Sequence, residues 1–166
     1  MASFEEALPW VLSHEGGWSN DPADPGGATN YGITLATAQK HGIPDAEALK
    51  IITPEQVAAI YRSGYWCFSG LVNQAVSTKL LDMAVNLGPY AAIRIVQDVL
   101  NAMGADLAED GHWGSKTEAA ANAAPADRLL DHLCRDLADY YLNLASRRPA
   151  SGKFLKGWLR RAEDRP

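Results

Sequence analysis

The sequence predicts a mainly α-helical protein with one small β-hairpin or loop after its first helix. Hydroxyl residues followed three positions later by a carboxylate or amide residue, which is typical of capped helix starts, occur several times. Apolar residues recur at helical spacing after these starts, and no segment alternates long enough for a large sheet. With 166 residues, of which 47% are hydrophobic, the chain is long enough to bury one core and is most simply one domain or a domain with a small appendage.

The first helix is expected to begin near Phe4, where Ser3 and Glu6 form a capping box. Two glycines, 16 and 17, are expected to end it, because glycine adopts the left-handed conformation at little steric cost. Glu15 then lies in the last turn, where the carbonyl end of the helix disfavours negative charge. Burial beside Trp10, Trp18 or another aromatic side chain would further favour the protonated carboxyl, which suits a general acid.

Two further helix starts are marked by capping boxes. Thr53 and Gln56 begin one helix, with Pro54 at its first position. Ser115 and Glu118 are predicted to begin another in the same way.

The centre and the end of the chain predict longer helices. Residues 77–88 and 89–104 should form two helices separated at Gly88, because Pro89 cannot continue the first but can begin the second. A long amphipathic helix of about five turns is expected after Pro125. Its apolar positions are Leu129, Leu130, Leu133, Cys134, Leu137, Tyr141 and Leu144.

The segment that interrupts this pattern most strongly is residues 13–34, which read SHEGGWSNDPADPGGATNYGIT. Asp21 and Asp24 lie among prolines and glycines, which enforce turns and leave backbone amides free for carboxylates, so we expect an ionised Asp here. Two carboxylates in unlike surroundings are what cleavage of a glycosidic bond requires. One protonates the leaving oxygen, as we expect of Glu15, and the other handles water or the positive charge that develops on the sugar.

Other residues in or near this segment are candidates for substrate contacts. Thr29 and Tyr31 are expected to position a water molecule or bind sugar hydroxyl groups, and a small hairpin is predicted near Trp18 and residues 31–33. Trp18, Asn30 and Asn86 are further candidate substrate-binding residues.

The same residues also fit other interpretations. Asp-Pro pairs are ordinary turn formers and a Glu near a helix end is common, so a purely structural role remains an alternative. A calcium loop is another, although two prolines interrupt the ligand spacing of an EF-hand. The histidines form no metal-like set, and no Ser or Cys has the context of a nucleophile. We therefore expect no metal and no cofactor.

The net charge and its distribution limit the kinds of binding partner that we expect. A formal net charge of −5 argues against a nucleic-acid binder, which normally presents a basic face to phosphates. Residues 147–166 hold seven Lys or Arg against two acidic residues. This basic tail fits either contact with an anionic polymer or membrane surface, or solvated helix ends.

The chain start and the cysteines indicate the compartment. The N-terminus has no basic leader and its apolar run is too short for a signal peptide or a membrane span. We therefore expect synthesis in the cytoplasm without a signal peptide, and no stable membrane insertion. Cys67 and Cys134 are expected to be buried thiols in preference to a disulfide.

At the first polar motif the sequence resembles glycoside hydrolase family 108, bacterial and phage N-acetylmuramidases with a lysozyme-like helical fold. The Glu of the family's Glu-Gly-Gly-Tyr motif is the catalytic acid, which the resemblance places on Glu15; Trp18 replaces the Tyr. The family's central helix pair is similar to the segment DMAVNLGPYAAIRIVQ. A peptidoglycan-binding module is similar to two later segments, LNAMGADLAEDGHWGSKT and GKFLKGWLRRAEDR. The resemblance implies a catalytic region over residues 1–90 and a helical peptidoglycan-binding-like region over 91–166, packed on the same core.

A looser similarity concerns the second carboxylate. Phage lysozymes of the Glu-x8-Asp-x5-Thr type place an Asp nine residues after the acid, and Asp24 lies nine residues after Glu15. The Thr comes one residue early, at Thr29. This favours Asp24 over Asp21 as the second catalytic group, with Thr29 as its helper.

These resemblances imply an N-acetylmuramidase that cleaves the β-1,4 bond between N-acetylmuramic acid and N-acetylglucosamine, and that serves as the lytic enzyme of a phage. Its expected partner is the peptidoglycan glycan strand. The enzyme would be a monomer that waits in the cytoplasm for a membrane pore and acts in the periplasm or cell wall. A lytic transglycosylase and a noncatalytic wall-binding or secretion-assisting protein remain alternatives.

Overall fold

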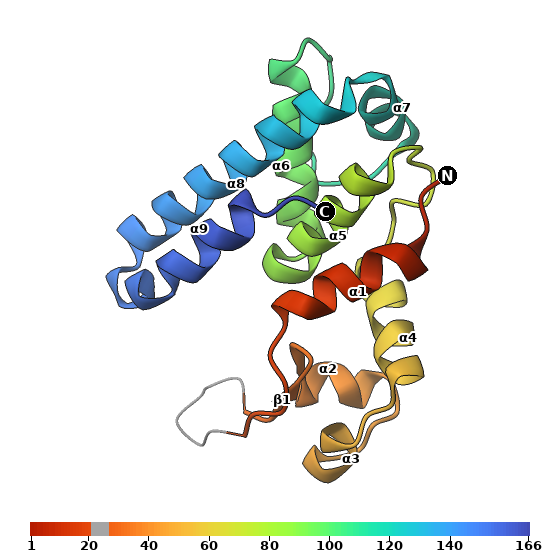
Figure 1. The fold of residues 1–166 in the computed structure, drawn as a ribbon, viewed down its shortest axis with the longest axis vertical. Helices are drawn as coiled ribbons and strands as arrows, with labels where there is room; N and C mark the ends of the chain where they lie inside the picture. The colour runs from red at the N-terminus through yellow and green to blue at the C-terminus, as the bar shows by residue number, and fades with distance from the viewer. Residues whose placement is uncertain (21–26) are drawn as a thin grey trace.

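The computed structural model describes residues 1–20 and 27–166 and confirms the mainly α-helical fold (Figure 1). In Figure 1, α1 lies between a helical body that contains α5 to α9 and a smaller part that contains the hairpin and α2 to α4. The elements are α1 (Phe4–His14), β1 (Thr29–Asn30), β2 (Ile33–Thr34), α2 (Leu35–Lys40), α3 (Ala46–Lys50), α4 (Pro54–Tyr65), α5 (Gln74–Leu87), α6 (Pro89–Ala102), α7 (Ser115–Ala123), α8 (Ala126–Arg147), a 3₁₀ helix (Pro149–Phe154) and α9 (Leu155–Glu163).

The capping box predicted at Thr53 is complete, whereas the one predicted at Ser3 is only half formed. The Thr53 hydroxyl accepts from the backbone N–H of Gln56 at 3.3 Å, and the Gln56 side chain accepts from the backbone N–H of Thr53 at 3.0 Å. Ser3 caps α1 by accepting from the backbone N–H of Glu6 at 3.3 Å. The backbone N–H of Ser3 donates to Gln74 of α5 at 2.7 Å. The start of α1 is therefore attached to the helical body as well as capped.

The predicted capping box at α7 is wrong by one position. Gly114 is the N-cap residue, and Ser115 is already helical without a side-chain cap. The carboxylate of Glu118 accepts from the indole N–H of Trp113 at 3.3 Å. Glu118, which the local pattern assigned to the helix cap, therefore makes a tertiary contact with Trp113 instead.

The end of α1 also differs from the prediction. The helix ends at His14, and Glu15 is its C-cap residue with an extended backbone (φ −89°, ψ 142°). Gly16 and Gly17 do not adopt positive φ, so no left-handed residue ends this helix. Because Glu15 follows the helix with an extended conformation, the chain turns here toward the hairpin.

The predicted hairpin is confirmed. β1 and β2 pair antiparallel, with Thr29 opposite Thr34 and Asn30 opposite Ile33. Tyr31 (φ 50°) and Gly32 (φ 70°) form the two-residue turn. Positive φ at both turn positions matches the right-handed twist of the strands, which places Gly32 at the tip of the hairpin.

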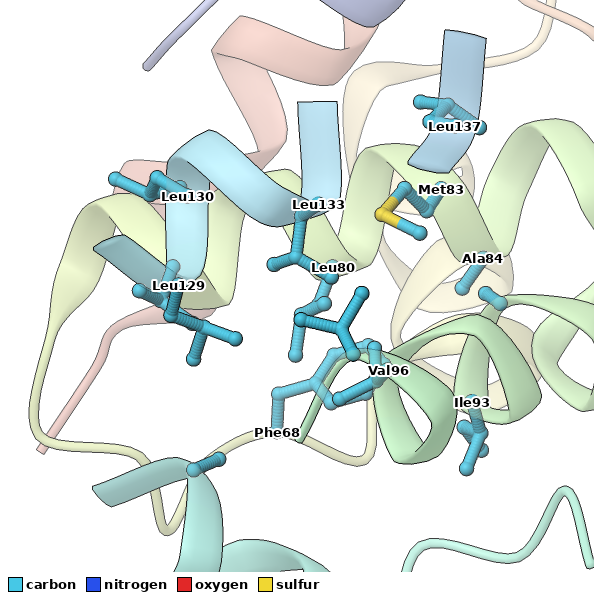
Figure 2. Packing of buried hydrophobic residues seen from close by; sticks show 14 of the residues in the cluster. Phe68, Leu80, Met83, Ala84, Ile93, Val96, Leu129, Leu130, Leu133 and Leu137 are labelled. Carbon is cyan, nitrogen blue, oxygen red and sulfur yellow. The ribbon is translucent and has the colours of Figure 1, made fainter. Parts of the chain in front are cut away.

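The core forms two hydrophobic clusters that meet at α5. In the first, Leu80, Val96 and Leu133 from α5, α6 and α8 point toward one another next to Phe68 (Figure 2). The second joins α1 to the hairpin, α3 and α4, and includes Leu81. Consecutive residues of α5 thus face different clusters, so α5 holds the helical body against the smaller part.

The other predicted helices are present. α5 and α6 are separated at Gly88, which has φ 85°, and α8 is the long amphipathic helix expected after Pro125. Cys134 is buried, but Cys67 is exposed, so the expectation of two buried thiols is wrong for Cys67. Within residues 1–20 and 27–166, no helix combines the length and the apolar character that a membrane span needs.

Candidate active site

Glu15 lies where α1 meets both the hairpin and α9. Its side chain is 14% exposed, so it is neither sealed in the interior nor open to bulk water. On one side, Nη2 of Arg161 in α9 donates to Oε1 of Glu15 at 2.7 Å. On the other side, Oε2 lies so close to Gly32 that a Cβ atom on this glycine would collide with it. The two carboxylate oxygens therefore face different parts of the protein.

The hairpin turn beside Glu15 is supported from α4. The hydroxyl of Tyr61 donates to the backbone carbonyl of Tyr31 at 2.6 Å. The same hydroxyl lies 3.3 Å from the point where a Cβ of Gly32 would be. Burial, and then the nearby Glu15, raise the pKa of Tyr61 above its usual range, so this phenol stays a neutral hydrogen-bond donor beside the acid.

The other neighbour of Glu15, Arg161, is held by a buried carboxylate. Asp82 of α5 is 1% exposed, and its Oδ1 lies 2.9 Å from Nη2 of Arg161. Nε of Arg161 donates to both carboxylate oxygens, at 3.1 and 3.2 Å. Burial opposes the charge of Arg161, but Asp82 and then Glu15 outweigh it and raise the pKa of the guanidinium. The site thus holds a permanent cation between two carboxylates.

His14 belongs to the same group of charges. Its Nδ1 lies 3.3 Å from Oδ1 of Asp82, and its Nε2 lies 3.2 Å from Oδ2 of Asp164. Its ring also meets Trp10 edge to face, with ring centroids 5.4 Å apart. The contacts of His14 are therefore with the carboxylates of Asp82 and Asp164.

A cavity of about 280 Å³ opens next to this group. It is lined from α1, α5 and α9, by Ser13, His14, Asn86, Gly157, Trp158, Arg160 and Arg161. The rings of Trp158 and Tyr141 stack with centroids 5.3 Å apart. The hydroxyl of Tyr141 donates to Oδ1 of Asn86 at 2.6 Å. Of the predicted substrate-binding residues, Asn86 is the one that lines this cavity.

The remaining predicted residues of the polar segment have varied surroundings. Trp18 packs partly buried against the second cluster, and Tyr31 is 39% exposed at the hairpin turn. Thr29 pairs through its backbone with Ser19, at 2.8 and 2.9 Å. Asn30 is buried, and its amide donates to two carbonyls at the end of α3, each at 3.1 Å. These bonds give Asn30 a role in joining the hairpin to α3.

Asp21 and Asp24 lie outside the described residues. Within the described parts of the chain, no three His, Cys, Asp or Glu side chains gather as they would around a metal ion.

Sequence reasoning missed four residues of this site: Gly32, Tyr61, Asp82 and Arg161. Asp82 carried a usable signal, because it is a carboxylate among apolar neighbours in the middle of a predicted core helix, and buried carboxylates are normally paired. Arg161 carried none, since it is one of several basic residues in a charged tail.

Buried Tyr61 predicts a loss of stability at alkaline pH. Because folding raises its pKa, its contribution to stability is complete below about pH 10, the pKa of a tyrosine in an unfolded chain, and is lost as the pH rises toward the folded pKa. The free energy of unfolding should therefore fall above about pH 10, and Tyr61→Phe should make this fall shallower. Urea unfolding on both sides of pH 10 measures it. Tyr90→Phe, at a tyrosine that is 58% exposed, is the matched control and should leave the slope unchanged.

Two family models and a solved structure match this chain. Residues 8–88 match the model of a family described as glycosyl hydrolase 108, and residues 91–163 match one described as a predicted peptidoglycan domain. The solved structure of SagA from Brucella abortus is 36% identical in sequence, over 96% of this chain and 88% of that chain, with a TM-score of 0.78. No protein with a curated description matches the sequence.

Proposed function

Because this chain belongs to glycosyl hydrolase family 108, we propose that it is an N-acetylmuramidase that cleaves the β-1,4 bond between N-acetylmuramic acid and N-acetylglucosamine. Membership of this family indicates a glycosidase, and the match to a predicted peptidoglycan domain supports peptidoglycan as its substrate. The observation that carries the finer proposal is the partly exposed carboxyl of Glu15, held by Arg161 at the end of α1.

Glu15 is the general acid in this proposal. Arg161 occupies Oε1, so in the reactive state Oε2 holds the proton and passes it to the leaving glycosidic oxygen. The carboxyl is the ion-pair partner of Arg161 once that proton has left. Loss of that bond leaves positive charge on the sugar. Asp24, or in its place Asp21, stabilises this charge or activates the attacking water, and Thr29 assists it. The reaction needs two carboxyl groups and water, and no cofactor.

The substrate contacts in this proposal come from the smaller part with the hairpin and from α5 of the helical body. Trp18 and Tyr31 offer aromatic surfaces near the hairpin, and Asn86 offers its side chain to the cavity beside α9. Asn30 assists indirectly, because its amide holds the hairpin against α3. The division into a catalytic region, 1–90, and a peptidoglycan-binding-like region, 91–166, stays a prediction, as do the monomeric state and the role as a phage endolysin released by a membrane pore.

Product analysis tests the proposal. Purified peptidoglycan is digested with the wild-type protein, and the soluble fragments are analysed by mass spectrometry before and after borohydride reduction. We expect fragments that end in reducible N-acetylmuramic acid. Anhydro ends would identify a lytic transglycosylase instead, reducible N-acetylglucosamine ends would identify the other bond, and release of nothing while the protein sediments with the wall would identify a noncatalytic binder. Each of these three results contradicts the proposal.

A further inference from the structure

The last helix of the chain supplies a direct partner to the proposed acid. Arg161 and Glu15 lie 146 positions apart in sequence, yet their side chains form a hydrogen-bonded ion pair. Both side chains are largely shielded, at 10% and 14% exposure. Shielding separates this pair from exposed surface pairs, which are screened by solvent and contribute little. A charge-assisted bond of this kind fixes geometry as well as adding energy.

Arg161 is itself fixed through its side chain. Asp82 receives hydrogen bonds from Nε and lies within 2.9 Å of Nη2, the same nitrogen that donates to Glu15. Because Asp82 is 1% exposed on a helix that faces both core clusters, it cannot move without disturbing the core. Because the guanidinium is planar and bonded to Asp82 of α5, it holds the carboxyl of Glu15 in a fixed position relative to α5.

The backbone of Arg161 is fixed as well. Lys79, one turn before Asp82 on α5, is 1% exposed. Its ammonium donates to the backbone carbonyls of Arg161, Ala162 and Asp164, at 2.9, 2.9 and 2.7 Å. These carbonyls lie at the C-terminal end of α9, where a helix has no backbone donors of its own and where a cation is favourable. One helix, α5, thus holds both the main chain and the side chain of Arg161.

We propose that Arg161 is a positioning residue for Glu15: it holds Oε1 so that Oε2 stays beside the hairpin turn, in one orientation toward the substrate. The inference rests on the proposed function of Glu15 as the acid. If Arg161 has this role, residues from both halves of the chain form the catalytic site, because Arg161 lies beyond residues 8–88, which match the glycosyl hydrolase model. In this inference α9 serves the acid directly, because without Arg161 the acid loses its orientation.

The experiment measures kcat and KM separately on soluble peptide-bearing glycan oligomers. Arg161→Met removes the charge but retains a long side chain. We expect kcat to fall about 10²-fold, because a shift of about 1 Å in a reacting group has this effect, while KM changes little. Arg161→Lys should lie between Arg161→Met and the wild type, since a lysine retains the charge but cannot bond two carboxylates with a planar fork. A wild-type kcat in Arg161→Met overturns the inference, and so does a loss confined to KM, which would indicate a substrate contact.

Further variants separate orientation from folding. Arg161→Met leaves Asp82 buried without its guanidinium, so Arg161→Met combined with Asp82→Asn removes the unpaired charge. In this double variant kcat should stay low, and its return to the wild-type value would overturn the inference.

Arg165→Met is the matched control, because Arg165 pairs with Asp131 on the exposed surface, and it should behave as wild type. Glu15→Gln is assayed in parallel. If that variant is active, the proposed function itself fails; if it is inactive while Arg161→Met is unaffected, only this inference fails.

Discussion

Glu15→Gln should leave a folded protein that hydrolyses peptidoglycan about 10²–10⁴-fold more slowly than the wild type. Glutamine has the size of glutamate, and its side-chain oxygen can still accept the hydrogen bond from Arg161 that holds Oε1. What the variant lacks is an acidic proton for the leaving oxygen. The loss should therefore appear in kcat, measured from the release of reducing ends, while the far-ultraviolet circular dichroism spectrum remains that of the wild type.

The matched control for Glu15→Gln is Glu5→Gln. Glu5 lies in α1, the helix that Glu15 follows, and also pairs with an arginine, Arg62, but that pair is on the exposed surface. The control should hydrolyse peptidoglycan at the wild-type rate. Equal rates for Glu15→Gln and the wild type would show that Glu15 does not donate the proton.

Gly32→Ala should lower activity about 10²-fold through contact with the acid. The new Cβ would occupy space that Oε2 of Glu15 fills now. Because Oε2 is the end of a flexible side chain, it can move aside, but it then leaves the position from which it reaches the substrate, and about 1 Å of misplacement is enough for this loss. The positive φ of this residue, 70°, should also reduce the free energy of unfolding by about 1–2 kcal/mol. Hydrolysis rates and urea unfolding of the same preparation measure the two effects.

Gly42→Ala separates these two effects. Gly42 also has positive φ, 82°, but a Cβ there would meet nothing within 4 Å. The control should show a comparable loss of stability with full activity. If both variants lose activity to the same degree, backbone strain explains the loss and the contact between Gly32 and Glu15 is not needed.

The sequence was sufficient where a short stretch of chain determines its own structure. The reciprocal bonds of Thr53 and Gln56 at the start of α4, the interruption at Gly88, and the long helix α8 all follow from caps, glycine, proline and apolar spacing within one segment. The hairpin belongs here only in part, because Gly32 favours the positive φ that the turn requires, whereas Tyr31, the other turn residue, is a bulky residue that rarely adopts it. Local signals misled where tertiary contacts compete with them, as at Glu118, whose carboxylate bonds to Trp113 and does not cap α7.

The site divides in the same way. The sequence by itself determined α1 and α4 to α8, the presence of a small hairpin and, through the motif around Glu15, the family and its class of chemistry. The tertiary structure alone decided what surrounds that carboxyl: Arg161 from the last helix, Asp82 and Lys79 from α5, and Gly32 from the hairpin tip. The physical reason is that caps and periodicity act over a few residues, whereas an ion pair between positions 15 and 161 exists only once α5 has brought α1 and α9 together.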